Sequence, residues 1–138
     1  MKIPNYAYKN NGNLTFTDVT KEWGLSVPSF SNGTAYVDLD NDGDLDLVVN
    51  NINTAAFVFI NNTNQKNKPS ITHYVSLTLT GDSLNRPGFG AKVWGYNNGM
   101  VHLQEENPVR GYFSSVDGQL IFGWGKKDND DSAVIELP

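Results

Sequence analysis

The segment Tyr36–Val49, YVDLDNDGDLDLVV, places five aspartates within nine positions and then runs into an apolar stretch. The aspartates are Asp38, Asp40, Asp42, Asp44 and Asp46. At the effective dielectric constants of a protein surface, each pair of like charges a few ångströms apart costs roughly 1 to 4 kcal/mol. A chain that concentrates such repulsion beside its core is expected to bind a cation there.

The spacing of these aspartates indicates which cation the loop would bind. Counted from Asp38, the carboxylates stand at positions 1, 3, 5 and 9 of a loop, with Gly43 at position 6. Alternate carboxylates can converge on one hard cation, while the glycine permits the sharp turn that lets the backbone carbonyl of Asp44 supply position 7. Oxygen ligands in a flexible arrangement favour Ca²⁺ over Mg²⁺. The predicted metal ligands are Asp38, Asp40, Asp42, Asp44 and Asp46.

The type of calcium loop also follows from the spacing. An EF-hand needs a glutamate at position 12, where this chain has Val49. The flanking segments TAYV and LDLVV are typical of strands, not of amphipathic helices. We therefore expect a strand-loop-strand site in which Asp46 closes the ligand shell; the alternative is an acidic solvated turn that binds nothing.

Short alternating segments separated by turn residues predict an all-β chain. The pairs typical of tight hairpin turns are Asn11-Gly12, Asn98-Gly99 and Asp117-Gly118. The expected strands are Thr34–Leu39, Leu45–Asn50, Ala56–Ile60, His73–Thr80, Ala91–Tyr96, Met100–Glu106, Gly111–Val116, Leu120–Trp124 and Ala133–Leu137. The sequence has no sustained helical periodicity, although Thr17–Leu25 could form one short helical turn.

One strand pattern also predicts a buried face. In the segment Tyr74–Thr80, YVSLTLT, apolar and polar residues alternate. Successive side chains of a strand point to opposite faces of its sheet. Val75, Leu77 and Leu79 should therefore share one face that packs on a core.

A weak internal repeat and a polar connector divide the chain. Tyr8–Asn13 (YKNNGN) resembles Phe59–Asn64 (FINNTN) at a separation of 51 residues, which suits a four-stranded propeller blade. The segment Asn61–Thr72 is polar and contains Pro69, as linkers often do. We expect one unit at residues 1–68 and a second at residues 69–138.

Both units resemble known families. FSNGTAYVDLDNDGDLDLVVNN followed by FVFINN resembles an FG-GAP/VCBS-type repeat, and FTDVTKEWGL is similar to the lead-in of such repeats. HYVSLTLTGDSLNRPGFGAKVWGYNNG, VRGYFSSVD and FGWG resemble the ASPIC/UnbV domain that follows these repeats in cartilage acidic protein and its bacterial relatives. The resemblance implies one propeller-blade-like calcium-loop unit plus a small antiparallel β-sandwich or barrel-like module.

Two departures from the family pattern bear on assembly. A propeller needs several blades and this chain carries one, so either it is cut from a longer protein or this blade packs against the second unit. The chain also ends in ELP where the family often has a Trp-Pro-x-Gly element. These features suggest the C-terminal part of a longer protein whose signal segment is absent here. An exposed strand edge could then drive formation of a homodimer.

Composition excludes several classes of function. The net charge of −5 does not suit a surface that collects phosphates, so nucleic acid is not an expected partner. No apolar run reaches the roughly 18 residues that a membrane span needs. The chain contains no cysteine, which excludes disulfides, thiolate metal sites and a cysteine nucleophile.

The sequence offers no recognisable catalytic motif. His73 and His102 lie in expected strands without a serine or aspartate at a motif spacing. Glu105 and Glu106 are adjacent, so they should point to opposite faces of a strand and cannot act as a carboxylate pair. We expect that the protein is not an enzyme.

The expected function is that of a noncatalytic calcium-binding β module in an extracellular or cell-surface protein, mediating adhesion or recognition of a protein or glycan ligand. Extracellular calcium modules bind at roughly 10⁻⁴ to 10⁻³ M, which favours a secreted location. The alternative is a carbohydrate-binding or accessory domain of a secreted enzyme. That alternative predicts a flat exposed row of aromatic rings from Trp94, Tyr96, Tyr112 or Trp124.

Overall fold

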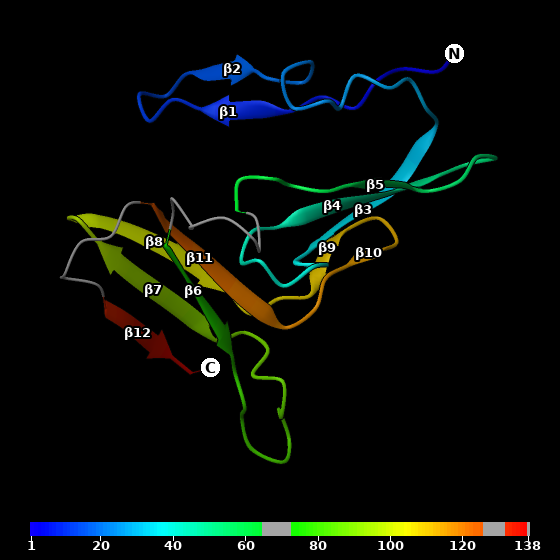
Figure 1. Cartoon of the computed structure of the whole chain (residues 1–138). Helices are drawn as coiled ribbons and strands as arrows, with labels where there is room; N and C mark the ends of the chain where they lie inside the picture. The colour runs from blue at the N-terminus through cyan, green and yellow to red at the C-terminus, as the bar shows by residue number, and fades with distance from the viewer. Residues whose placement is uncertain (65–72, 126–131, 138) are drawn as a thin grey trace.

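The computed structural model describes residues 1–64, 73–125 and 132–137, and these ranges form strands and turns without a helix (Figure 1). The all-β fold class is thus confirmed. The strands are β1 (Tyr8–Asn10), β2 (Phe16–Asp18), β3 (Ser31–Val37), β4 (Asp46–Asn51), β5 (Phe57–Phe59), β6 (His73–Thr78), β7 (Lys92–Asn97), β8 (Met100–Glu105), β9 (Val109–Gly111), β10 (Ser114–Ser115), β11 (Gln119–Gly125) and β12 (Ser132–Glu136). The described ranges contain no helix long and apolar enough to cross a membrane.

The strands pair antiparallel in small sheets. The hairpin β1-β2 stands alone, β3-β4-β5 form a three-stranded sheet that carries the acidic loop, and β9-β10 form a second hairpin. The remaining sheets are β6-β11 and β12-β7-β8. In Figure 1 β6 and β11 cross over β7 and β8, as the two layers of a small sandwich would.

The main core lies between these two layers. Val93 of β7 packs with Leu120, Phe122 and Trp124 of β11, and all four side chains are buried. The half-buried side chains packed against them are Val75, Leu77 and Leu79. The alternation in YVSLTLT therefore predicted the core-facing side of β6 correctly.

A glycine on β7 sets how closely the two layers approach. A Cβ at Gly95 would lie 3.0 Å from the Phe122 ring, so the missing side chain lets that ring rest on the strand. The β7-β8 hairpin turns at Asn98 and Gly99, whose φ angles are 50° and 73°. Two successive positive φ angles define the primed turn that this Asn-Gly pair predicts.

The other two turn pairs behave differently. Asn11 and Gly12 lie in the β1-β2 connection, where the Asn11 N–H donates to the Thr15 carbonyl across a longer loop. Asp117 and Gly118 precede β11, which pairs with β6, so the expectation of a hairpin at this pair is wrong. The long-range pairing with β6 overrides the local turn preference.

The expected strand Gly111–Val116 is also wrong. The chain turns at Tyr112 and Phe113 between β9 and β10, and Phe113 adopts a φ of 47°. Both rings are largely exposed and pack edge to face with centroids 4.6 Å apart. A sequence pattern of alternating residues cannot distinguish a straight strand from a hairpin this short.

Two further expectations concern the first part of the chain. After β2, the Trp23 N–H donates to the Val19 carbonyl at 2.8 Å, which gives the single helical turn expected there. The weak repeat appears as a shared turn directly after β1 and β5, where Asn10 Oδ1 accepts from the Gly12 N–H and Asn61 Oδ1 from the Thr63 N–H. The expected boundary near Pro69 lies outside the described residues.

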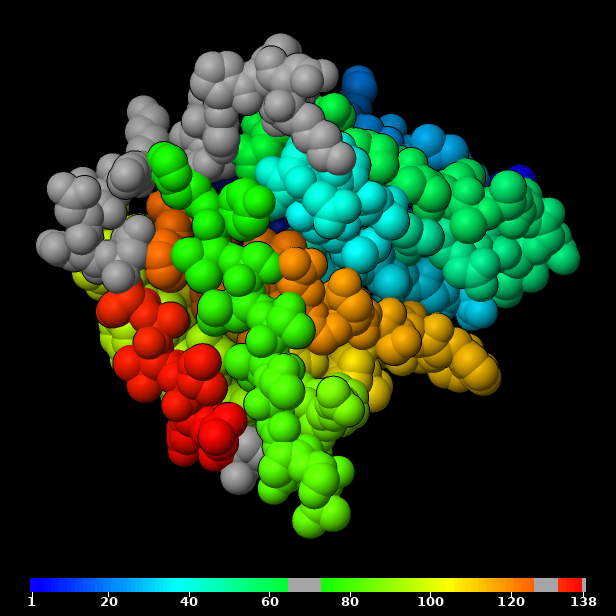
Figure 2. Space-filling model, turned by 60° about the horizontal axis from the view of Figure 1, so that its bottom comes forward, coloured from blue at the N-terminus to red at the C-terminus, as the bar shows by residue number. Residues whose placement is uncertain are grey.

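The two parts of the chain touch directly. The Thr34 N–H of β3 donates to Ser114 Oγ at 3.0 Å, which joins the first sheet to the β9-β10 hairpin. The Tyr74 ring of β6 lies against Gly43 in the acidic loop. In Figure 2 the cyan segment with this loop lies against the green and orange segments of the second part.

Candidate metal site

The acidic loop connects two paired strands of the first sheet. β3 ends at Val37 and β4 begins at Asp46, and these two residues face each other in the antiparallel register. The loop is therefore closed at its base by the sheet. Further along β4, Val49 pairs with Thr34 and is 1% exposed.

Three carboxylates converge inside the loop. Oxygens of Asp38, Asp40 and Asp42 all lie within 4.8 Å of one another, and all three residues are half-buried. Among the described residues this is the only such group of three potential metal ligands. The alternate spacing in the sequence thus does bring these side chains to one point.

The electrostatics of the metal-free loop are unfavourable. Burial raises the pKa of Asp42, and the charges of Asp40 and Asp38 raise it further, while the Asp44 N–H opposes the shift. A cation at this point would favour the charged carboxylates and lower that pKa again. The loop therefore has the charge and the oxygen atoms that a divalent cation requires.

Backbone hydrogen bonds shape the loop. The Asp38 carboxylate accepts from the Asp42 N–H at 3.1 Å and from the Gly43 N–H at 3.0 Å. Asn41 and Gly43 adopt φ angles of 57° and 89°, which residues other than glycine and asparagine rarely adopt. The first carboxylate therefore also holds the turn in which the metal would bind.

Asp46 has a structural role that the sequence did not reveal. Its side chain is only 2% exposed. Oδ2 accepts from the Leu39 N–H at 2.9 Å, and Oδ1 accepts from the Asn61 N–H at 2.8 Å. Asp46 thus ties the loop to the chain that follows β5, and its expected contact with a metal stays a prediction.

Asp44 is likewise tied to the chain beyond β5. Its Oδ2 accepts from the Asn64 N–H at 2.7 Å, while Oδ1 is buried without a hydrogen-bond partner. Burial raises the pKa of Asp44, the Asn64 N–H opposes this, and Asp42 adds to the rise. The sequence assigned only the backbone carbonyl of Asp44 to the metal, and that assignment stays a prediction.

The side chains considered for catalysis are not among the three converging carboxylates. His73 begins β6 and is exposed, and His102 is half-buried in β8. Glu105 is exposed whereas Glu106 is 1% exposed. Both residues line one cavity, so their expected placement on opposite faces stays a prediction. The sequence does not predict that Glu106 is buried, because the residue follows a strand in which polar and apolar residues alternate as in any half-exposed strand.

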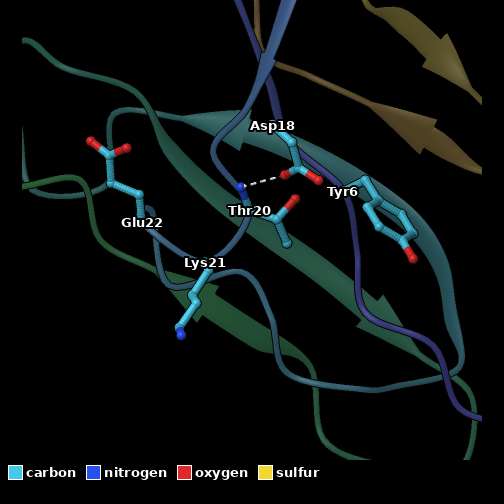
Figure 3. A pocket seen from close by; sticks show the side chains of 5 residues that line it. All are labelled: Tyr6, Asp18, Thr20, Lys21 and Glu22. Atoms are coloured by element: carbon cyan, nitrogen blue, oxygen red, sulfur yellow. Dashed lines mark hydrogen bonds between the residues drawn. The ribbon is translucent and has the colours of Figure 1, made fainter.

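A separate hollow lies beside the β1-β2 hairpin (Figure 3). The Asp18 carboxylate accepts from the Thr20 N–H at 2.9 Å, and hydrogen bonds from Thr20 lower the pKa of Asp18. Figure 3 shows Lys21 and Glu22 directed away from Asp18 and Tyr6. These groups do not converge on a common point, so the hollow offers no reaction centre.

Comparison with known families agrees with this geometry. Residues 4–49, which include the acidic loop, match the family model of the FG-GAP-like repeat. An FG-GAP-like repeat corresponds to a β-propeller blade, which agrees with the all-β fold described above.

The second part of the chain matches a different family model. Residues 81–138 match the family model of ASPIC and UnbV. The two matches thus follow the order that the resemblance implied, an FG-GAP-like segment before an ASPIC and UnbV segment. No curated protein and no solved structure gives a significant match.

Proposed function

We propose that this chain is a calcium-stabilised, noncatalytic β module of an extracellular or cell-surface protein that acts in adhesion or ligand recognition. The observation that carries the proposal is the convergence of Asp38, Asp40 and Asp42 within 4.8 Å in a loop between two strands. The FG-GAP-like match over the same residues supports it. Calcium is proposed because the converging donors are all carboxylate oxygens, the hard ligands that this cation prefers.

Binding of calcium would stabilise more than the loop. The cation would offset the repulsion among the three carboxylates, of which Asp38 also holds the N–H of Gly43. Gly43 in turn supports the Tyr74 ring of β6. An ion that binds only the folded loop therefore also stabilises the contact between Gly43 and the Tyr74 ring of β6.

The test is a calorimetric titration of chelator-stripped protein with calcium chloride, accompanied by thermal unfolding. We expect a dissociation constant of roughly 10⁻⁴ to 10⁻³ M. At a hundredfold excess over that constant, the folded state should gain about 2.7 kcal/mol. Asp40→Asn should weaken binding at least tenfold, because it removes one converging carboxylate.

The matched control is Glu136→Gln, which removes a carboxylate of the exposed strand β12. This variant should bind calcium as the parent does. A parent that neither binds calcium nor gains stability would sink the proposal and leave the loop as a solvated turn. If Asp40→Asn and Glu136→Gln weakened calcium binding equally, the effect would come from the net charge of the protein and not from the loop.

One observation favours carbohydrate binding as a second candidate function. In β7, Trp94 and Tyr96 lie on the face opposite Val93, and Tyr96 is 38% exposed. Their cross-strand neighbours Leu103 and Val101 on β8 are each more than half exposed. The sheet β12-β7-β8 thus presents two aromatic rings within an apolar outer face.

This candidate predicts that Trp94→Ala lowers the affinity for a glycan at least tenfold, because stacking of a ring on a sugar needs the exposed aromatic face. The measurement is a glycan-array screen of the parent followed by titration of each variant. Tyr112→Ala is the control, since that exposed ring lies on the β9-β10 turn. Trp124 is buried in the core and cannot contribute to such a row. Absence of any glycan signal, or equal losses in both variants, would exclude the candidate.

A further inference from the structure

A second polar site lies between the two parts of the chain. A cavity of about 290 Å³ is lined by Tyr36 and Leu45 of the first part and by Glu106, Arg110, Asp117 and Gln119 of the second. It is separate from the point where the three loop carboxylates converge. No feature of the calcium proposal uses it.

Glu106 is the distinctive residue of this cavity. Its side chain is 1% exposed, and its Oε2 has no hydrogen-bond partner. A Cβ built at Gly118 would lie 3.4 Å from Glu106 Oε1. The carboxylate therefore faces the Asp117–Gln119 segment, and both ends of that segment line the cavity.

The groups around Glu106 compensate its charge only in part. Burial raises the pKa of Glu106, the Arg110 charge opposes this, and Asp117 adds to the rise. The Arg110 guanidinium lies over the Tyr36 ring, 5.7 Å from its centroid, instead of pairing with Oε2 of Glu106. A buried carboxylate oxygen without a donor costs free energy unless a donor reaches it.

The surroundings favour an organic cation over a metal ion. Among the described residues only Asp38, Asp40 and Asp42 bring three ligand atoms together, so Glu106 and Asp117 do not form a metal cluster. A calcium ion would need six to eight oxygens, whereas five of the twelve residues that line this cavity are apolar. The apolar members are Leu45, Leu103, Val116, Leu120 and Ile121.

We propose that this cavity binds an alkylammonium group, with Glu106 and Asp117 accepting hydrogen bonds from the ammonium and the apolar wall contacting its carbon chain. An ammonium supplies up to three donors and one positive charge on a flexible aliphatic stem. The group could come from a free amine or from a lysine side chain. Both sources share the chemistry that the cavity recognises.

The test is an NMR or calorimetric titration of the whole chain with n-butylammonium chloride. We expect saturable binding, a loss of at least tenfold in affinity for Glu106→Gln, and no measurable binding of n-butanol. Glu106→Gln keeps the size of the side chain and removes a buried charge, so it should fold. Gly118→Ala provides a second variant, because its Cβ would narrow the space beside the carboxylate.

Glu136→Gln is the control and should leave binding unchanged, because Glu136 lies on β12 away from the cavity lining. N-acetyl-lysine-N-methylamide, titrated in parallel, identifies the source. Tighter binding than n-butylammonium indicates a lysine side chain, and weaker binding indicates a free amine. A parent that does not bind n-butylammonium, or a Glu106→Gln variant that binds it equally well, would overturn the proposal. The outcome does not depend on calcium, since Asp40→Asn should bind n-butylammonium normally.

Discussion

Replacing Asp46 by asparagine should lower the free energy of unfolding by about 3 to 5 kcal/mol, even when a chelator keeps the loop free of metal. The buried carboxylate accepts from the N–H groups of Leu39 and Asn61. An asparagine amide can accept from one of them, but its own N–H₂ group then faces the other donor. One charge-assisted hydrogen bond is lost and buried donors are left unpaired.

Chemical denaturation in chelator measures this effect, with Asp40→Asn as the matched variant. Asp40 carries no hydrogen bond in the described part of the chain, and its replacement relieves repulsion within the loop. Asp40→Asn should therefore leave metal-free stability unchanged or slightly higher. If Asp46→Asn were as stable as the parent in chelator, the supporting role assigned to Asp46 would be wrong.

Gly43→Ala should lower the free energy of unfolding by about 2 to 5 kcal/mol. The φ angle of 89° costs a residue with a side chain about 1 to 2 kcal/mol. The new Cβ would also overlap the Tyr74 ring, and overpacking of this kind typically costs about 1 to 3 kcal/mol. Both costs come from the added Cβ: one from the backbone conformation and the other from overlap with the Tyr74 ring.

Gly12→Ala separates the two costs. Gly12 has a φ of 76°, and a Cβ there would meet nothing within 4 Å. This variant should therefore show the backbone cost alone. In the background of Tyr74→Ala, the additional effect of Gly43→Ala should fall towards the Gly12→Ala value. An effect of Gly43→Ala that is independent of Tyr74 would contradict the packing of β6 on the loop.

The local features of this chain were readable from its sequence, because they depend on neighbours a few residues apart. The 1, 3, 5 spacing placed three carboxylates together, Asn98 and Gly99 gave a primed turn, and YVSLTLT identified the inner face of β6. Expected strand positions also correspond to observed strands, with the exception of Gly111–Val116.

The features that sequence did not reveal depend on distant partners. Asp46 accepts a hydrogen bond from the N–H of Asn61, fifteen residues away. The contact of the Tyr74 ring with Gly43 joins the two parts of the chain. The burial of Glu106 depends on the Asp117–Gln119 segment, which the pairing of β11 with β6 positions. None of these contacts leaves a periodic pattern in the chain.

The pairing of β6 with β11 bears on how this chain can be divided. β6 begins at His73, before the ASPIC and UnbV match at residue 81, yet it contributes the partner of β11. A fragment that started at residue 81 would leave the β11 backbone with an open edge. It would also uncover the core side chains Leu120 and Phe122. The smallest piece that keeps this sandwich intact therefore has to include β6, ahead of the matched segment.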